Sequence, residues 1–157
     1  DMARFIVDKE IDEIYVKGEA LIDQEILKVG DIDTAVVVMK YVDSTIAIID
    51  NSRKAAYGYD QRIEVFGSKG MIQANNIKVD NSKLYNQNGI MSSLPMDFFL
   101  ERYMEAYKIE IEHFVDSVIN NKRISVTGYD GLRSLQIGLA AKKSLLENRP
   151  VKINEII

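Results

Sequence analysis

The chain has 157 residues, enough for one domain with a single hydrophobic core. Its residues are 46% hydrophobic and 28% charged, the net charge is −4, and no apolar run approaches the roughly 20 residues of a membrane span. Acidic and basic residues are interspersed, so the sequence predicts neither a membrane protein nor a nucleic-acid partner. The lack of cysteine excludes disulfides and thiolate metal sites and agrees with a cytoplasmic location.

The first part of the chain carries weak local signals. Met2, Phe5 and Ile6 have helical spacing, which indicates the end of a helix within 1–7. Because the chain starts at Asp1 without an initiator Met, we expect it to be a piece of a longer protein. A strand is predicted over 11–17, while 18–33 has no assignable pattern.

From Thr34 onward, short β-branched runs alternate with turn residues. Strands are predicted at 34–41, 45–51, 61–67, 70–75, 77–80 and 82–85. The segment Gly67-Ser68-Lys69-Gly70 predicts a hairpin turn, because glycine accepts the positive φ that such turns need. The nearly continuous apolar runs Val36–Val38 and Ile46–Ile49 indicate strands that are covered on both faces.

Two helices follow the strands. After Pro95, apolar residues recur at helical spacing down to about Asn121, at Leu100, Tyr103, Tyr107, Ile111, Phe114 and Val118. A second helix is predicted over 129–147, because Thr127 and Asp130 have the spacing of a capping box. Its apolar stripe contains Leu132, Leu135, Leu139 and Leu146.

Strands followed by helices predict an α+β fold, with an open, mainly antiparallel sheet and the helices packed on one face. We expect residues 1–157 to form a single domain. The opposite face of the sheet would expose a large apolar area, so the pattern predicts self-association through it. Cover by polar residues and solvent is the alternative.

Several kinds of site are excluded by what the sequence lacks. The nine glycines never form G-x-G-x-x-G, so the chain has no dinucleotide-binding cradle and no Rossmann domain. The single histidine, His113, is expected to be an exposed helix residue. One histidine without cysteine predicts no metal site, and no G-x-S-x-G presents a serine nucleophile.

One polar stretch, Asp50 to Arg62, is chemically unusual. It places acids, amides, bases and two tyrosines within a short loop between strands. Such a set suits a polyhydroxylated ligand, because neighbouring hydroxyls need paired donors and acceptors and tyrosine rings can form walls. An ordinary polar hairpin loop is the other interpretation.

The same residues carry a resemblance. Asp1-Met2-Ala3-Arg4-Phe5, the run from Gly30 to Gly70 that includes Asn51-Ser52-Arg53 and Tyr57-Gly58-Tyr59-Asp60-Gln61-Arg62, and Tyr129-Asp130-Gly131-Leu132 are similar to inositol 2-dehydrogenases. These enzymes belong to the glucose-fructose oxidoreductase, inositol dehydrogenase and rhizopine-catabolism superfamily. The resemblance covers essentially the entire chain. It implies that the chain corresponds to the C-terminal substrate-binding and oligomerisation domain of such an enzyme.

The resemblance implies an enzyme that oxidises a cyclic polyol such as myo-inositol with NAD or NADP and assembles as a homotetramer through sheet surfaces. The family's catalytic lysine, aspartate and histidine would lie outside this chain, so the chain alone is expected to be inactive and to bind no cofactor. Substrate contacts are expected at Asp1 and Tyr57, and also at Tyr59 and Asp60. Another sugar or rhizopine oxidoreductase and a non-enzymatic binding or assembly module are the alternatives.

Overall fold

The computed structural model describes residues 1–156 and divides into two compact units. The first unit contains Asp1–Lys54 and the chain from Ile124 onward, and the second contains Ala55–Arg123. The first unit is built from α1 (Met2–Val7), β1 (Ile11–Glu19), the 3-10 helix η1 (Gln24–Val29), β2 (Thr34–Tyr41), β3 (Ile46–Ser52), α3 (Gly128–Glu147), β8 (Val151–Lys152) and the 3-10 helix η2 (Ile153–Glu155). Whether the chain behaves as a single domain stays a prediction.

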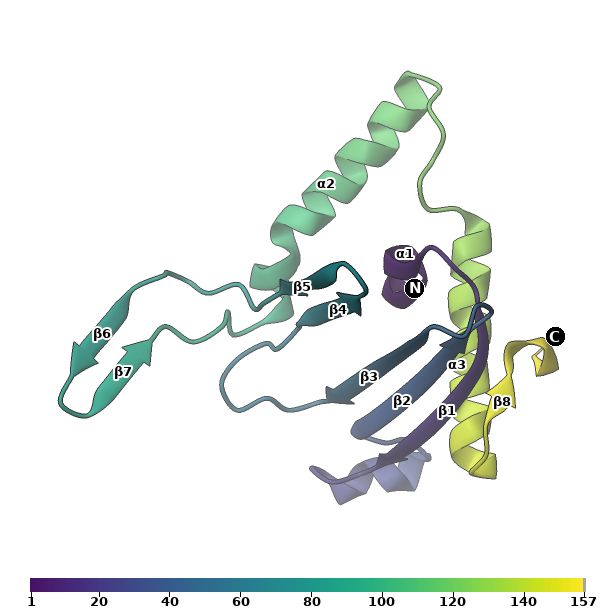
Figure 1. Ribbon diagram of the computed structural model, residues 1–157, viewed down its shortest axis with the longest axis horizontal. Coiled ribbons are helices and arrows are strands. Elements are labelled where there is room, and N and C mark those ends of the chain that lie inside the picture. Colours follow the sequence, from purple (N-terminus) through teal and green to yellow (C-terminus); the bar gives the residue numbers. More distant parts are fainter. Residues whose placement is uncertain (157) are drawn as a thin grey trace. The chain divides into compact units, whose positions relative to one another are not determined.

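The first unit holds a four-stranded antiparallel sheet in the order β3-β2-β1-β8 (Figure 1). In its register, Ile14 pairs with Met39 and Val16 with Val37, so these side chains share one face. Helix α3 covers that face. The α+β class and the open antiparallel sheet are therefore confirmed.

The hydrophobic core lies between this face of the sheet and α3. Its buried residues are Ile11, Ile14, Val16, Met39, Tyr41, Ala140, Val151 and Ile153. The Tyr41 hydroxyl donates a hydrogen bond to the Ala3 carbonyl at 2.9 Å, which ties α1 to the end of β2. A buried tyrosine hydroxyl needs such a partner.

The other face of the sheet carries exposed apolar side chains on β2 and β3, bordered by the charged residues Lys17, Lys40 and Asp50. By register, Val38 lies opposite Ile48, and Val36 and Ile46 point to the same side. All four are exposed, and Ile48 has 66% of its surface accessible. The apolar runs of the sequence thus correspond to strands with one packed face and one free face within this chain.

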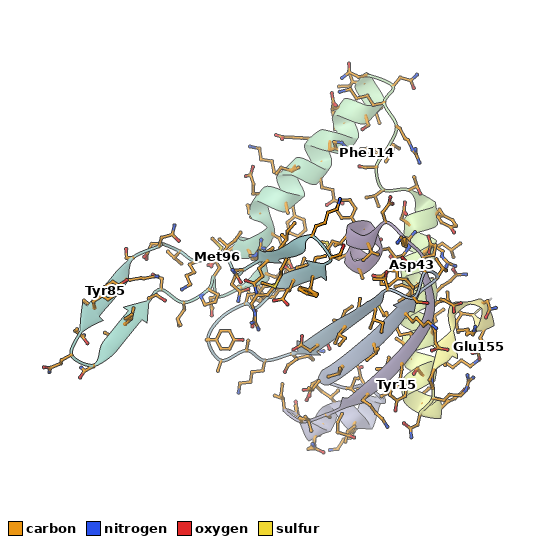
Figure 2. All side chains as sticks on the ribbon, in the orientation of Figure 1. Tyr15, Asp43, Tyr85, Met96, Phe114 and Glu155 are labelled. Carbon is orange, nitrogen blue, oxygen red and sulfur yellow. The ribbon has the colours of Figure 1, made fainter. Side chains whose placement is uncertain are left out.

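The second unit contains two hairpins and a long helix. Its elements are β4 (Ile63–Gly67), β5 (Gly70–Ala74), β6 (Lys83–Asn86), β7 (Gly89–Ser92) and α2 (Phe99–Ile119). Strands β4 and β5 pair around the predicted turn at Gly67–Gly70. The stripe predicted for α2 is largely exposed, as Phe114 in Figure 2 illustrates, and no apolar side chain within 55–123 is fully buried.

Two local predictions are wrong. No strand forms over 77–80, where Lys78 makes only an isolated bridge to Pro95, because the Asp80 carboxylate accepts hydrogen bonds from the Ser82 amide and Ser93 hydroxyl and bends the chain. The leucine stripe of α3 is exposed. The helix instead packs through Ala140 and Ser144, because these small side chains let it approach β1 closely.

The capping box of α3 is present, with Asp130 accepting from the Thr127 amide at 2.8 Å. Strand β7 and the short strand β8 were not predicted. Among residues 1–156, no helix is long and apolar enough to cross a membrane.

Candidate functional site

Three of the four predicted substrate-contacting residues lie together. Tyr57, Tyr59 and Asp60 are in the loop that leads into β4, in the second unit. Asp1 belongs to the first unit, where it holds the N-cap position of α1 without a side-chain capping hydrogen bond. The role of all four in substrate binding stays a prediction.

The loop that carries the tyrosines is shaped by Gly58. Its φ of +124° is one that residues with a Cβ rarely adopt. A Cβ at this position would also lie 2.8 Å from the Pro95 carbonyl oxygen. Next to it, the Tyr59 amide donates to the carbonyl of Met96 at 2.7 Å (Met96 is labelled in Figure 2). Gly58 therefore allows the loop to close against the segment before α2.

The Asp60 carboxylate is the centre of a polar cluster. Arg62 donates to it through Nε, at 2.7 Å, and through Nη2, at 2.9 Å. Asn76 donates from Nδ2 at 2.7 Å, and the Tyr57 hydroxyl donates to Oδ2. Each carboxylate oxygen thus accepts two hydrogen bonds from within the chain. Asn76 also accepts from the Gln61 amide at 2.7 Å, which anchors the start of β4.

Electrostatics match this geometry. The hydrogen bonds from Arg62, Tyr57 and Asn76 lower the pKa of Asp60 to about 2. The hydrogen bond to Asp60, followed by partial burial and the charge of Asp60, raises the pKa of the Tyr57 hydroxyl. Arg62 opposes that rise through its charge and a hydrogen bond. At neutral pH the cluster therefore holds an ionised carboxylate and a protonated phenol, and 45% of the Tyr57 surface remains accessible.

Tyr59 faces the long helix rather than the Asp60 cluster. Its ring meets that of Tyr103 edge to face, with 5.7 Å between the ring centroids. The hydroxyl of Tyr103 donates to the side chain of Gln61. Burial and the neighbouring Tyr59 raise the pKa of Tyr103 to about 12, so it stays protonated. Tyr59 is thus half-buried and packs as a wall of the loop.

Asp1 lies beside an ion-pair network that joins α1, β1 and α3. Arg4, with only 10% of its side chain accessible, donates to Glu10 at 2.7 Å and to Asp130 at 3.2 Å. Arg133 also donates to Glu10, at 2.9 Å, and the Asp1 carboxylate lies 3.5 Å from Arg4. The hydrogen bond with Glu10 is the main cause that raises the pKa of Arg4, and the same bond lowers that of Glu10.

A hollow of about 520 Å³ lies over this network. It is lined by Asp1, Arg4, Phe5, Asp8, Lys9, Glu10, Ser125, Val126 and Asp130. Sequence reasoning selected Asp1 alone from this set. Asp1 and Glu10 are near Arg4 in sequence, but its third partner, Asp130, lies 126 residues away, so no local pattern could indicate the network.

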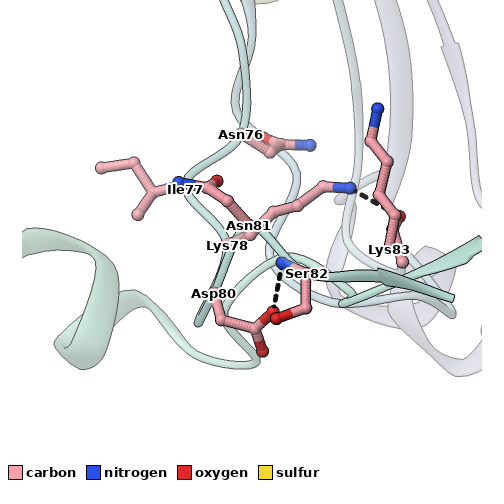
Figure 3. A pocket seen from close by; sticks show the side chains of 8 residues that line it. Asn76, Ile77, Lys78, Asp80, Asn81, Ser82 and Lys83 are labelled. Atoms are coloured by element: carbon pink, nitrogen blue, oxygen red, sulfur yellow. Dashed lines mark hydrogen bonds between the residues drawn. The ribbon is translucent and has the colours of Figure 1, made fainter.

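A second hollow, of about 400 Å³, lies in the second unit (Figure 3). Its lining is Asn76, Ile77, Lys78, Asp80, Asn81, Ser82, Lys83 and Ser92. Lys78 donates to the Ser92 hydroxyl at 2.8 Å, and Asp80 accepts from the Ser82 amide at 2.7 Å. The first bond ties the segment before β6 to β7, and the second closes the turn at Asp80.

Sequence reasoning missed two members of the Asp60 cluster as site residues. Arg62 lies inside the polar stretch and could have been found from its composition. Asn76 follows sixteen residues after Asp60, beyond the β4–β5 hairpin, and only the pairing of those strands brings it back.

His113 is exposed on α2, as predicted. Among the described residues, no group of three or more histidines and carboxylates is placed to hold a metal ion. This finding does not test the prediction that the protein has no metal site.

The sequence of the chain matches a known protein family. Residues 1–73 match the family model described as the GFO/IDH/MocA C-terminal domain. Over these residues the chain is similar to the C-terminal domain of this family.

Its relatives include inositol dehydrogenases. The chain is 48% identical over 157 residues to the myo-inositol 2-dehydrogenase of Thermotoga maritima, covering 100% of this chain and 47% of that protein. A probable dehydrogenase from Thermotoga maritima has a similar structure, with a TM-score of 0.97 and 47% identity over 99% of this chain and 47% of that one. The scyllo-inositol dehydrogenase of Lactobacillus casei, solved with bound NAD(H) and scyllo-inositol, has a TM-score of 0.88 and 29% identity over 97% of this chain and 45% of that one. The chain therefore spans about half the length of the relatives it matches.

Proposed function

We propose that this chain is the substrate-holding and assembly part of an inositol 2-dehydrogenase. The observation that carries the proposal is the 48% identity to a myo-inositol 2-dehydrogenase over the whole chain. The exposed Tyr57 side chain, whose hydroxyl is fixed by Asp60 in a polar loop, supports it because polyol recognition needs fixed hydrogen-bonding groups. The complete enzyme would oxidise one ring hydroxyl of a cyclic polyol such as myo-inositol.

The nicotinamide cofactor has no suitable cradle among the residues of this chain. The sequence lacks G-x-G-x-x-G, and every strand pair of residues 1–156 is antiparallel, so no parallel βαβ unit offers a helix N-terminus to a pyrophosphate. We therefore assign NAD or NADP to the rest of the full-length enzyme and derive no step of the reaction through it.

The contribution of this chain is positioning. Tyr57 would hydrogen-bond a non-reacting ring hydroxyl, with Tyr59 forming the wall behind the loop. Asp1, the N-cap residue of α1 in the first unit, is proposed separately as a substrate contact. Holding the ring in one orientation converts binding energy into a lower barrier, and such positioning supplies several kcal/mol in enzymes, about 7 or more when the geometry is ideal.

The second part of the proposal is self-association. Four exposed residues form an apolar patch on one side of β2 and β3, beside the charged Lys17, Lys40 and Asp50; they are Val36, Val38, Ile46 and Ile48. Contiguous apolar surface of this kind is uncommon on monomers and marks interaction sites. We propose that a second copy of the chain covers it and that the parent enzyme is a homotetramer.

The test is reduction of NAD and NADP by the full-length protein with myo-inositol, scyllo-inositol, other stereoisomers and glucose, beside the 157-residue chain alone. We expect turnover of an inositol by the full-length protein and none by the chain. Activity confined to another sugar would keep the fold and role but change the specificity. Turnover by the isolated chain would contradict the proposal, because its catalytic groups are assigned outside these residues.

A further inference from the structure

The Asp60 carboxylate has no free hydrogen-bonding capacity. A carboxylate offers about four acceptor positions. Arg62 and Asn76 occupy those of Oδ1, while Arg62 and Tyr57 occupy those of Oδ2. Only 16% of the Asp60 side chain is accessible. A substrate hydroxyl that approached Asp60 would have to displace one of these partners.

We propose that Asp60 is a positioning residue: it acts on the substrate through Tyr57, whose phenol it orients and fixes as a hydrogen-bond acceptor. The inference rests on the proposed function, since it concerns how the same loop reads a polyol. It reassigns Asp60 from a direct substrate contact to the partner of one.

The direction of the hydrogen bond follows from the protonation states. Asp60 is ionised at neutral pH, since its pKa is about 2, so it can only accept. The Tyr57 hydroxyl therefore donates its single proton in a hydrogen bond to Asp60. Its oxygen keeps its lone pairs: one accepts from Arg62, and the other can only accept a further hydrogen bond. The ring hydroxyl that meets Tyr57 must accordingly be the donor.

The first experiment measures the hydrogen bond itself. Full-length protein labelled with 13Cζ-tyrosine is titrated by NMR, and Tyr57→Phe identifies the resonance. In Asp60→Asn the pKa of Tyr57 should fall, because the variant removes the acceptor and the negative charge that stabilise the protonated phenol. Asp80→Asn, a matched change elsewhere in the same unit, should leave it unchanged. An unaltered Tyr57 pKa in Asp60→Asn would overturn the proposal.

A second variant, expected to shift the pKa of Tyr57 in the opposite direction, distinguishes the loss of a specific contact from local unfolding. Arg62→Gln removes a cation that lowers the pKa of Tyr57, so this pKa should rise above the wild-type value. Local unfolding of the loop would instead return the pKa of Tyr57 to its ordinary value in both variants. A fall in both would therefore show disruption of the loop and count against the assigned geometry.

The second experiment separates action through Tyr57 from direct contact. KM and kcat for myo-inositol are measured for Tyr57→Phe, Asp60→Asn and the double variant. Tyr57→Phe should lower kcat/KM roughly tenfold, the effect of one lost hydrogen bond. The double variant should be no worse than Tyr57→Phe, because Asp60 then has nothing to position. Multiplicative losses would mean that Asp60 meets the substrate independently and would reject the proposal.

A third measurement tests whether the substrate hydroxyl is the donor in its hydrogen bond with Tyr57. Monodeoxyfluoro inositols keep a group of similar size that cannot donate a hydrogen bond. At one ring position, fluorine should cost wild-type protein as much as Tyr57→Phe does and cost the variant nothing further. Undiminished kcat/KM for every fluorinated analogue would contradict an accepting Tyr57. If the wild type turns over no polyol at all, the proposed function fails, and the titration alone decides whether Asp60 holds Tyr57.

Discussion

Asp33 explains the segment that has no pattern in the sequence. Its side chain is buried and accepts hydrogen bonds from the amides of Leu21, Ile22 and Asp23, each at 2.9 Å. The Thr34 hydroxyl donates to it at 2.9 Å as well. One carboxylate thus closes the loop between β1 and β2 by satisfying three backbone groups that have no strand partner.

The same carboxylate predicts a pH dependence. Burial alone would raise the pKa of Asp33, but the hydrogen bonds outweigh it and lower the pKa from 3.8 to about 2. A depressed folded-state pKa adds stability at pH values above 3.8, and this is lost as the pH falls toward 2. Thermal melts of the chain should show Asp33→Asn less stable than wild type at pH 7, with the difference shrinking below pH 4, at about the ordinary pKa of Asp. Because other carboxylates titrate in the same range, the difference between the two proteins is the quantity to follow, and a constant difference would refute this role.

At the scale of the elements, Ser144 decides which side of α3 faces the sheet. It is fully buried, at 0% accessibility, and accepts from the Val16 amide at 3.0 Å while its hydroxyl donates to the Arg149 carbonyl at 2.6 Å. Strand β8 pairs with β1 only at Glu13 and Ile14, so Val16 would otherwise have no partner on that edge. Helix α3 thus supplies, through Ser144, the hydrogen-bond acceptor for Val16 that the short strand β8 does not reach.

Ser144→Ala should therefore destabilise the chain by about 1–3 kcal/mol, because it leaves a buried amide and a carbonyl unpaired. Ser134→Ala is the matched control on the same helix, since the buried Ser134 hydroxyl has no hydrogen-bond partner within the described residues. Urea unfolding measures both. Equal losses for the two variants would show that Ser144 acts by packing and not by its hydrogen bonds.

At this scale, periodicity predicted the existence of both helices but not their faces. Leu132, Leu135 and Leu139 have the spacing of a buried stripe, yet all three are exposed. The packed side centres on the buried Ala140 and Ser144, with Ile137 and Leu145 partly buried beside them. The small residues carry little hydrophobic signal and are selected by the closeness of the helix to β1. The stripe of α2 is also largely exposed. Helical spacing of apolar residues therefore did not show which side of this helix is packed.

At the scale of the whole molecule, burial is unevenly distributed between the two units. Every fully buried apolar side chain of residues 1–156 belongs to the first unit. The exposed face of its sheet carries Val36, Val38, Ile46 and Ile48. Such a distribution is expected of a chain that completes its buried surface by assembly.

Ile48→Lys should reduce the assembly state of the full-length protein, because a charge would be buried without a partner in the contact between copies. Size-exclusion chromatography with light scattering would detect the lower mass. Leu146→Lys, at an exposed position of α3 outside this face, should leave the mass unchanged. Equal masses for Ile48→Lys and wild type would exclude the sheet face as the contact.

Local sequence determined what depends on near neighbours. The extent of β2, the turn between β4 and β5, and the capping box of α3 follow from β-branched runs, glycine φ and Thr-x-x-Asp spacing. The polar loop around Tyr57 was also visible from composition, and the family resemblance of its motif was confirmed.

Only the tertiary structure decided which polar groups satisfy one another. Asn76 reaches Asp60 because the β4–β5 hairpin folds the chain back, and Asp130 reaches Arg4 because α3 packs beside α1. These partners are distant in sequence, and the identity of either residue alone does not indicate the other. Hydrogen bonds act over about 3 Å, so the chain must first be folded before they exist. The role of Asp60 as an occupied carboxylate behind Tyr57 therefore became visible in three dimensions and not in the order of the residues.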